Sequence, residues 1–213
     1  MRIPLSLLPM WHVAAEDNPR YDMHGLRLER RPDGRLNVVA CNGRVLIVAE
    51  VDTAAPDGFT SAVIPRHICR VAAQVSKKTH RTPVTVEFVG DLATLEVPTG
   101  DGNVRLTAPA VTGRYPEWQP IIDALTARPM LEPTEEQRRA MVPAKLGVRV
   151  FRELLAALEG MGLETVDFYL PAFQLPENQK GSNEEAILFR AVGDGVWPVV
   201  GCVMPVAGKS KPV

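Results

Sequence analysis

The sequence predicts an α+β protein built from repeated units, each with one helix followed by three antiparallel strands. Three observations predict this class. Apolar residues recur at helical spacing in three segments, 5–17, 63–76 and 148–161. Short β-branched or alternating runs follow each segment, separated by Gly, Asn and Asp. The chain has 213 residues, 46% apolar and 23% charged, as expected for a globular protein with a sizeable core.

The first unit spans residues 5–51. Its helix is expected in "LSLLPMWHVAAED" (5–17), where Pro9 comes early enough for a first turn to tolerate it. A strand is expected in residues 21–30, followed by a turn at "RPDGR". The run "LNVVACNGRVLIVAEV" (36–51) contains Asn42-Gly43, a two-residue hairpin signal between β-rich flanks.

The second unit repeats this order. A short helix is expected in residues 63–76, beginning near Pro65, because proline is favoured at the first helical position. Three strands follow in residues 83–90, 92–99 and 103–110, with turns at Asp91 and at "GDGN".

A charged segment with two prolines, residues 123–140, predicts a linker that includes a short helix near Glu135. The third unit then has the clearest helix, residues 148–161, with Gly160 and Gly162 as stop signals. Strands are expected in residues 165–170, 186–192 and 197–206. We describe the repeat as βαβββ-like, with helices on one face of antiparallel sheets, and each unit needs another to close its core.

Several motifs occur in an order that matches a known family. "VACNGRVLIVAEV" is similar to a strand pair with an "ATDGHRLA"-type hairpin, and "SAVIPRHICRVAAQV" to a "VIVPRK" strand-to-helix segment. "GRYPEWQPII" is similar to a "GRFPDY" segment, and "VVGCVMPV" to a "VMPM" end. Together these motifs resemble the bacterial DNA sliding clamp, the β subunit of the replicative polymerase.

The resemblance implies a DNA-clamp fold, in which helices line a ring around DNA and sheets form its outside. Residues 1–122 would form a complete domain similar to the family's middle domain. Residues 123–140 would be a linker, and residues 141–213 would resemble the C-terminal half of the third domain. The family's first domain and the first half of its third domain have no counterpart in the chain.

The resemblance also implies a function. A clamp-like protein would be a non-enzymatic processivity or scaffold factor in DNA replication. It would assemble with itself, contact double-stranded DNA, and bind clamp-binding-motif peptides of replication or repair proteins in a hydrophobic pocket.

The pocket is implied by residue-by-residue matches to the family motifs. Apolar, proline-shaped walls suit a hydrophobic peptide, and methionine adapts to different side chains. The alternative is that these residues are ordinary strand ends and core. Cys41 and Val45 replace the family's usual hydroxyl or basic residue, and "MPVAG" replaces "MPMRL", so the peptide preference should differ. The implied pocket residues are Met23, Cys41, Gly43, Arg44, Val45, Leu46, Pro116, Pro120, Ile121, Ile187, Met204, Pro205 and Val206.

A DNA-facing surface would need Lys and Arg side chains aimed at phosphates. A solvated helix face is the alternative interpretation, and "HVAAEDN" in the first helix is not basic. The candidate DNA-binding residues are Arg66, Arg70, Lys77, Lys78, Arg81, Lys145, Arg149 and Arg152.

Other function classes find little support in the sequence. The net charge is −1, so any DNA contact must come from a local basic face. The three cysteines and four histidines have no disulfide-framework or metal-motif spacing, so we expect a cytoplasmic protein without metal or cofactor. No apolar run approaches the ~20 residues that a membrane helix needs. No catalytic motif occurs, so an enzyme is disfavoured, whereas a peptide-binding adaptor or decoy that does not encircle DNA remains an alternative.

Overall fold

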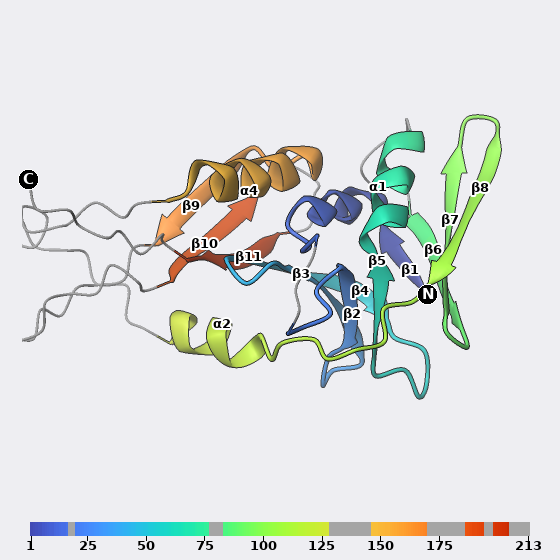
Figure 1. Ribbon diagram of the computed structural model, residues 1–213, viewed down its shortest axis with the longest axis horizontal. Helices are drawn as coiled ribbons and strands as arrows, with labels where there is room; N and C mark the ends of the chain where they lie inside the picture. The colour runs from blue at the N-terminus through green and yellow to red at the C-terminus, as the bar shows by residue number, and fades with distance from the viewer. Residues whose placement is uncertain (17–19, 77–82, 128–145, 170–185, 194–197, 205–213) are drawn as a thin grey trace, which may run out of the picture.

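The strands that the structure describes form two antiparallel sheets, and most of the described helical segments lie side by side over one face of them (Figure 1). The computed structural model describes residues 1–16, 20–76, 83–127, 146–169, 186–193 and 198–204. Its architecture confirms the predicted α+β class and clamp-type arrangement of helices and sheets.

The larger sheet has seven strands, and it joins the first repeat unit to the third. β11 pairs antiparallel with β4 through five register positions, from Val199 opposite Ala49 to Val203 opposite Val45. Four strands from residues 25–65 and three from residues 165–203 therefore form one continuous sheet. Its order is β5 (Ser61–Pro65), β2 (Gly25–Arg30), β3 (Arg35–Cys41), β4 (Val45–Ala54), β11 (Val199–Val203), β10 (Ile187–Val192) and β9 (Thr165–Tyr169).

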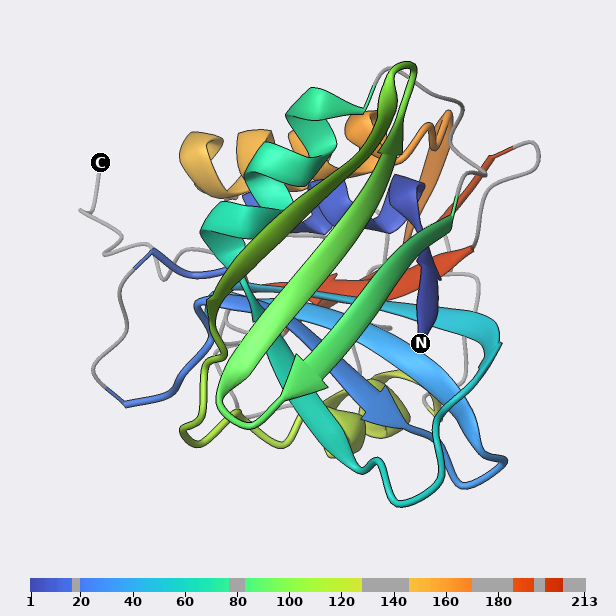
Figure 2. The ribbon, with the colours of Figure 1, turned by 90° about the vertical axis from the view of Figure 1, so that its right-hand side faces the viewer.

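The smaller sheet has four strands and faces the viewer in Figure 2. Its order is β1 (Arg2–Pro4), β6 (Pro83–Val89), β7 (Leu92–Thr99) and β8 (Gly102–Pro109). The two-residue turn between β7 and β8 fixes their register, with Thr99 opposite Gly102.

The first two units exchange their first strands. β1 precedes the helical segment of the first unit but pairs with β6, in the sheet of the second. β5 precedes the helix of the second unit but pairs with β2, in the sheet of the first. This exchange completes the βαβββ repeat, and it ties the two units together.

Three of the described helical segments lie on one face of the sheets, called the inner face from here on: η1 (Leu5–His12), α1 (Arg66–Val75) and α4 (Val148–Gly160). The helix predicted for residues 5–17 is wrong in length and type, because η1 is a 3-10 helix that ends at His12. Pro9 removes a backbone donor within it, and most of its side chains are buried, so packing rather than α-helical hydrogen bonding holds the segment.

On the opposite face of the larger sheet, called its outer face from here on, lies α2 (Gln119–Thr126). Residues 123–126 of the predicted linker are therefore helical, while the short helix expected near Glu135 lies outside the described residues. Because helices cover one face and α2 with its preceding segment covers the other, residues 36–40 of β3 and residues 45–49 of β4 are buried on both faces. No helix in the described ranges is long and apolar enough to cross a bilayer.

Candidate functional site

The segment "GRYPEWQPII" (113–122), named the strap from here on, closes over the outer face of the larger sheet. Its buried Trp118 donates a hydrogen bond from Nε1 to Glu29 Oε2 at 2.8 Å. The buried Tyr115 hydroxyl donates to the Val39 carbonyl at 3.4 Å, and the Arg27 guanidinium lies 5.2 Å from the Tyr115 ring centre. Two aromatic side chains thus anchor the strap to β2 and β3.

The start of the strap lies against residues 20–23. Asp22 donates its backbone N–H to the Arg114 carbonyl at 2.9 Å. Gly113 lies close to the Asp22 carboxylate, which would have to turn aside if Gly113 carried a Cβ.

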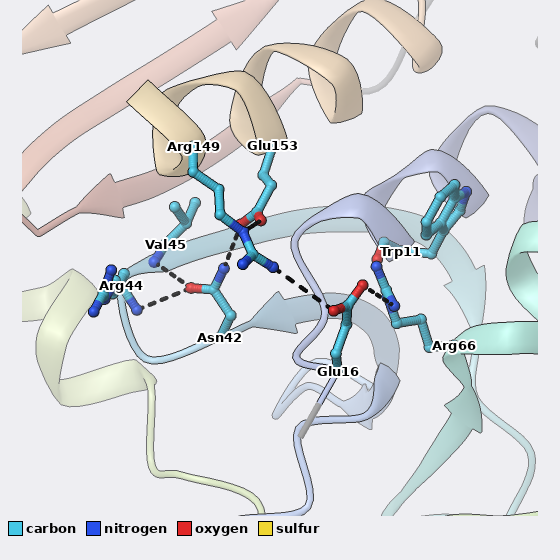
Figure 3. Close-up of polar contacts among 8 residues, drawn as sticks. All are labelled: Trp11, Glu16, Asn42, Arg44, Val45, Arg66, Arg149 and Glu153. Atoms are coloured by element: carbon cyan, nitrogen blue, oxygen red, sulfur yellow. Dashed lines mark hydrogen bonds and ion pairs between the residues drawn. The ribbon is translucent and has the colours of Figure 1, made fainter. Parts of the chain in front are cut away.

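The tip of the β3–β4 hairpin is held by the side chain of Asn42 (Figure 3). Asn42 Oδ1 accepts the backbone N–H groups of Arg44 at 2.9 Å and of Val45 at 2.8 Å. Gly43 has φ +83°, and the Asn42 N–H donates to the Val45 carbonyl at 3.2 Å, so the two central residues of the turn are Gly43 and Arg44. The predicted hairpin is present, but its turn lies one residue later than the predicted Asn42-Gly43 pair, with glycine at the first central position as in a type II′ turn. The Met204 N–H donates to the Arg44 carbonyl at 2.7 Å, so the end of β11 is attached to this tip.

The predicted pocket residues divide by burial. Ile121 is 44% exposed and Met204 39% exposed, and Gly43, Arg44 and Pro120 are also exposed. We name the peptide surface as the accessible members of the predicted set: Cys41, Gly43, Arg44, Pro116, Pro120, Ile121 and Met204.

The remaining described members of the predicted pocket set are buried: Met23, Val45, Leu46 and Ile187. Leu46 packs in the outer cluster with Trp118, Ile122 and Cys202, beneath the strap, whereas Val45 packs on the helix side. Leu46 supports the peptide surface from below and Val45 does not face it. Pro205 and Val206 lie outside the described residues.

The two thiols and the phenol at and beneath the peptide surface, Cys41, Cys202 and Tyr115, are neutral at pH 7. Burial raises the pKa of the Cys41 thiol, and it raises the pKa of Cys202 to about 12. Burial likewise raises the pKa of the Tyr115 hydroxyl. Arg44 is the one charged member of the peptide surface as defined, so this surface suits an apolar ligand with a carboxylate or carbonyl near the hairpin tip.

The helix side carries basic residues that are already paired. Arg66 on α1 contacts Glu16 at 3.0 Å (Nη1 to Oε1), and its Nε donates to the Trp11 carbonyl at 3.0 Å (Figure 3). Arg149 on α4 contacts Glu153 at 2.8 Å and Glu16 at 3.7 Å. Glu16 thus lies between two of the predicted DNA-binding arginines.

Sequence reasoning missed Glu16 and Glu153. Glu153 stands four residues after Arg149 on one helix, a spacing that predicts an ion pair. It also accepts a hydrogen bond from Asn42 Nδ2 at 3.2 Å, which ties α4 to the hairpin tip. Glu16 reaches its partners only through tertiary structure, so no local pattern marks it.

The other predicted DNA-binding residues are less constrained. Arg70 and Arg152 are exposed, on α1 and α4. Lys77, Lys78, Arg81 and Lys145 lie outside the described residues. Within the described ranges, no cluster of three or more His, Cys, Asp or Glu side chains is arranged to hold a metal ion.

Comparison with known proteins adds a fold assignment. No family model and no curated protein sequence matches the chain. Among solved structures, it is similar to the DNA polymerase III β subunit of Borrelia burgdorferi (TM-score 0.61, 10% identity, 97% of this chain and 63% of that chain). It is also similar to the DnaN sliding clamp of Bartonella birtlesii (TM-score 0.64, 15% identity, 96% and 65%) and to the β subunit of Pseudomonas aeruginosa (0.58, 18%, 97% and 66%).

The chain therefore spans just under two thirds of the length of these relatives while matching them over nearly all of its own. Because the sequence identities are only 10–18%, the structural similarity is evidence for the fold alone. Together with the two sheets, the row of inner helices and the hairpin joined to the last strand, it establishes that this chain has the fold of the bacterial DNA sliding clamp.

Proposed function

We propose that this protein is a non-enzymatic, clamp-like scaffold of DNA replication or repair in the cytoplasm. It assembles with itself and binds hydrophobic peptides of partner proteins on the peptide surface. Residues 1–122 act as a complete clamp-like domain and residues 141–213 as half of another. The main observation behind this proposal is the sliding-clamp fold across 96–97% of the chain.

The peptide surface supports this proposal because separate parts of the chain meet there. The Met204–Arg44 hydrogen bond joins the end of β11 to the hairpin tip. Ile122 of the strap packs with Leu46 and Cys202, so the exposed Ile121 and Pro120 are presented beside the same strands. Exposed apolar side chains on a rigid, buried base are what a peptide-binding surface needs.

A binding measurement tests the peptide surface. A fluorescein-labelled clamp-binding-motif peptide is titrated with wild type, Ile121→Ala, Met204→Ala and the control Val89→Ala. Val89 is 71% exposed but lies at the end of β6, in the smaller sheet. We expect each of the first two variants to weaken binding about tenfold, the effect of losing ~1.4 kcal/mol at a contact, and Val89→Ala to have no effect. Equal affinities for all four proteins would refute the assignment.

The helix side is the proposed DNA face, and Glu16 limits its affinity for phosphates by pairing with Arg66 and Arg149. Removing this carboxylate frees Arg66 from its ion pair and leaves Arg149 paired with Glu153 alone, so Glu16→Gln should bind duplex DNA more tightly. The slope of log K against log salt should steepen by about 1, because one added phosphate contact contributes ~0.9. Glu87→Gln is the matched control, since Glu87 pairs with Arg105 on the smaller sheet at 3.4 Å. An equal response of both variants would argue against a DNA face here.

Encirclement is tested separately, by light scattering and by retention on nicked circular DNA. Each chain carries three repeat units and the family's ring has about twelve, so four copies would close a ring. An oligomer that stays on circular DNA and leaves after linearisation supports a working clamp. The pairing of Arg66 and Arg149 with Glu16 favours one alternative, a peptide-binding adaptor or decoy that does not encircle DNA. Peptide binding without DNA retention would support that alternative.

A further inference from the structure

β8 is the outermost strand of the smaller sheet, and within the described part of the chain no strand pairs with its outer edge (Figure 2). It has eight residues in unbroken register with β7, and its proline is the last residue. Soluble proteins usually protect sheet edges with short strands, bulges, internal prolines or several charges. β8 carries only Arg105 as a charged residue, so it is a long and regular template for another strand.

The junction between β4 and β11 indicates which strand fits such an edge. Each of the three units ends in a last strand, namely β4, β8 and β11. Two of them, β4 and β11, pair with each other antiparallel and merge their units into one sheet. β8 is the last strand of the second unit, and in the described part of the chain it pairs with no last strand of another unit. A second copy of the protein offers the same unpaired last strand.

We propose that β8 pairs antiparallel with β8 of a second copy across a twofold axis. The pairing merges two four-stranded sheets into one eight-stranded sheet, and it is self-complementary, as a twofold interface requires. This inference rests on the proposed self-assembly and names the surface that performs it.

The backbone of β8 is set up for this contact. The two-residue turn makes Thr99 and Gly102 a hydrogen-bonded pair, and antiparallel pairs alternate from there. Asn103, Arg105 and Thr107 therefore direct their backbone N–H and C=O groups away from β7. Pro109 takes the next position of this series, so its missing N–H removes no bond to β7 and leaves the last outward position of β8 with a C=O acceptor only.

The sequence of β8 selects one register. Centring the twofold axis on Arg105 would place two guanidinium groups opposite each other, which is unfavourable. Centring the axis on Val104 would pair only residues 102–106 of the two copies, because β8 begins at Gly102, directly after the turn. Centring it on Leu106 pairs residues 103–109 of both copies, with Leu106 opposite itself and Arg105 opposite Thr107.

Proline substitution at the outer edge tests the pairing. Arg105→Pro removes an outward N–H without removing a bond to β7, and Arg105→Ala keeps the N–H while losing the same side chain and its contact with Glu87. We expect wild type and Arg105→Ala to have twice the mass of one chain or more by light scattering. Arg105→Pro should lose the β8 contact and halve that mass. Far-UV circular dichroism and the peptide titration check that the variant is folded.

Cysteine cross-linking tests the register. Under mild oxidation Leu106→Cys should form a covalent dimer, because directly opposite Cβ atoms lie ~4.5–5.5 Å apart. Val104→Cys and wild type should not. Absent cross-linking of Leu106→Cys, equal cross-linking of Val104→Cys, or an unchanged mass of Arg105→Pro would overturn the proposal. If the β8 contact passes these tests while peptide and DNA binding are absent, the proposed function fails and this interface stands.

Discussion

Trp118 should contribute more to stability than any other residue of the strap. Its buried ring packs with Met23, Val39 and Ile122, and its N–H reaches Glu29. Trp118→Ala removes the ring and leaves a cavity, which typically costs about 3–5 kcal/mol. Trp118→Phe keeps most of the apolar contact and loses one hydrogen bond, about 0.5–1.5 kcal/mol. Glu29 then still contacts Arg27 at 3.2 Å, so no charge is stranded.

Urea denaturation followed by far-UV circular dichroism measures both effects without relying on the altered tryptophan. With an m value of about 2 kcal/mol/M, Trp118→Ala should lower the midpoint by about 1.5–2.5 M and Trp118→Phe by less than about 1 M. Ile121→Ala is the control, because Ile121 belongs to the same strap but is largely exposed. If Trp118→Ala shifts the midpoint no more than Ile121→Ala does, the strap is not anchored as described.

Two further predictions concern the sheet junction and pH. Gly201→Ala should destabilise the protein by about 1–3 kcal/mol in the same assay, because the added Cβ would collide with the Leu46 carbonyl and the Phe189 ring. Gly100→Ala is the control and should leave stability unchanged, because the space around Gly100 is open. Burial is the larger cause, and the nearby Arg66 the smaller, of a lowered pKa of His12 in the folded protein. The unfolded state therefore binds the proton more readily, and the free energy of unfolding falls as pH drops through about 6.5. His12→Gln should reduce the difference in urea midpoint between pH 7.5 and 5.5, and an unchanged difference would contradict this role.

Local patterns predicted the elements whose cause is local. The hairpin near Asn42-Gly43 was predicted because its side-chain and glycine chemistry acts within four residues, although the turn is centred one residue later, on Gly43 and Arg44. The helices near α1 and α4 were correct because their apolar stripes face a core. β1 was missed because it has only three residues and is defined by pairing with β6, where Arg2 lies opposite Thr85.

In the candidate site, too, local features were predicted from the sequence and features that depend on tertiary contacts were not. The strap was recognised as a unit, but its anchoring through Glu29 and Val39 depends on tertiary contacts. The two-sided burial of β3 and β4 also requires knowledge of what covers each face, so pattern alone could not separate Val45, on the helix side, from Leu46 beneath the strap. The pairing of Arg66 with Glu16 joins residues 50 positions apart, which no local spacing encodes.

The β4–β11 junction has a consequence during synthesis. Ala49 and Val199 are register partners, and 199 minus 49 is 150 residues. At roughly 5–20 residues per second, the ribosome needs about 8–30 s to make the strand that covers the edge of β4. Throughout that interval the nascent chain presents an apolar strand edge, so we expect its yield to depend on chaperones that shield this edge until the last strand emerges.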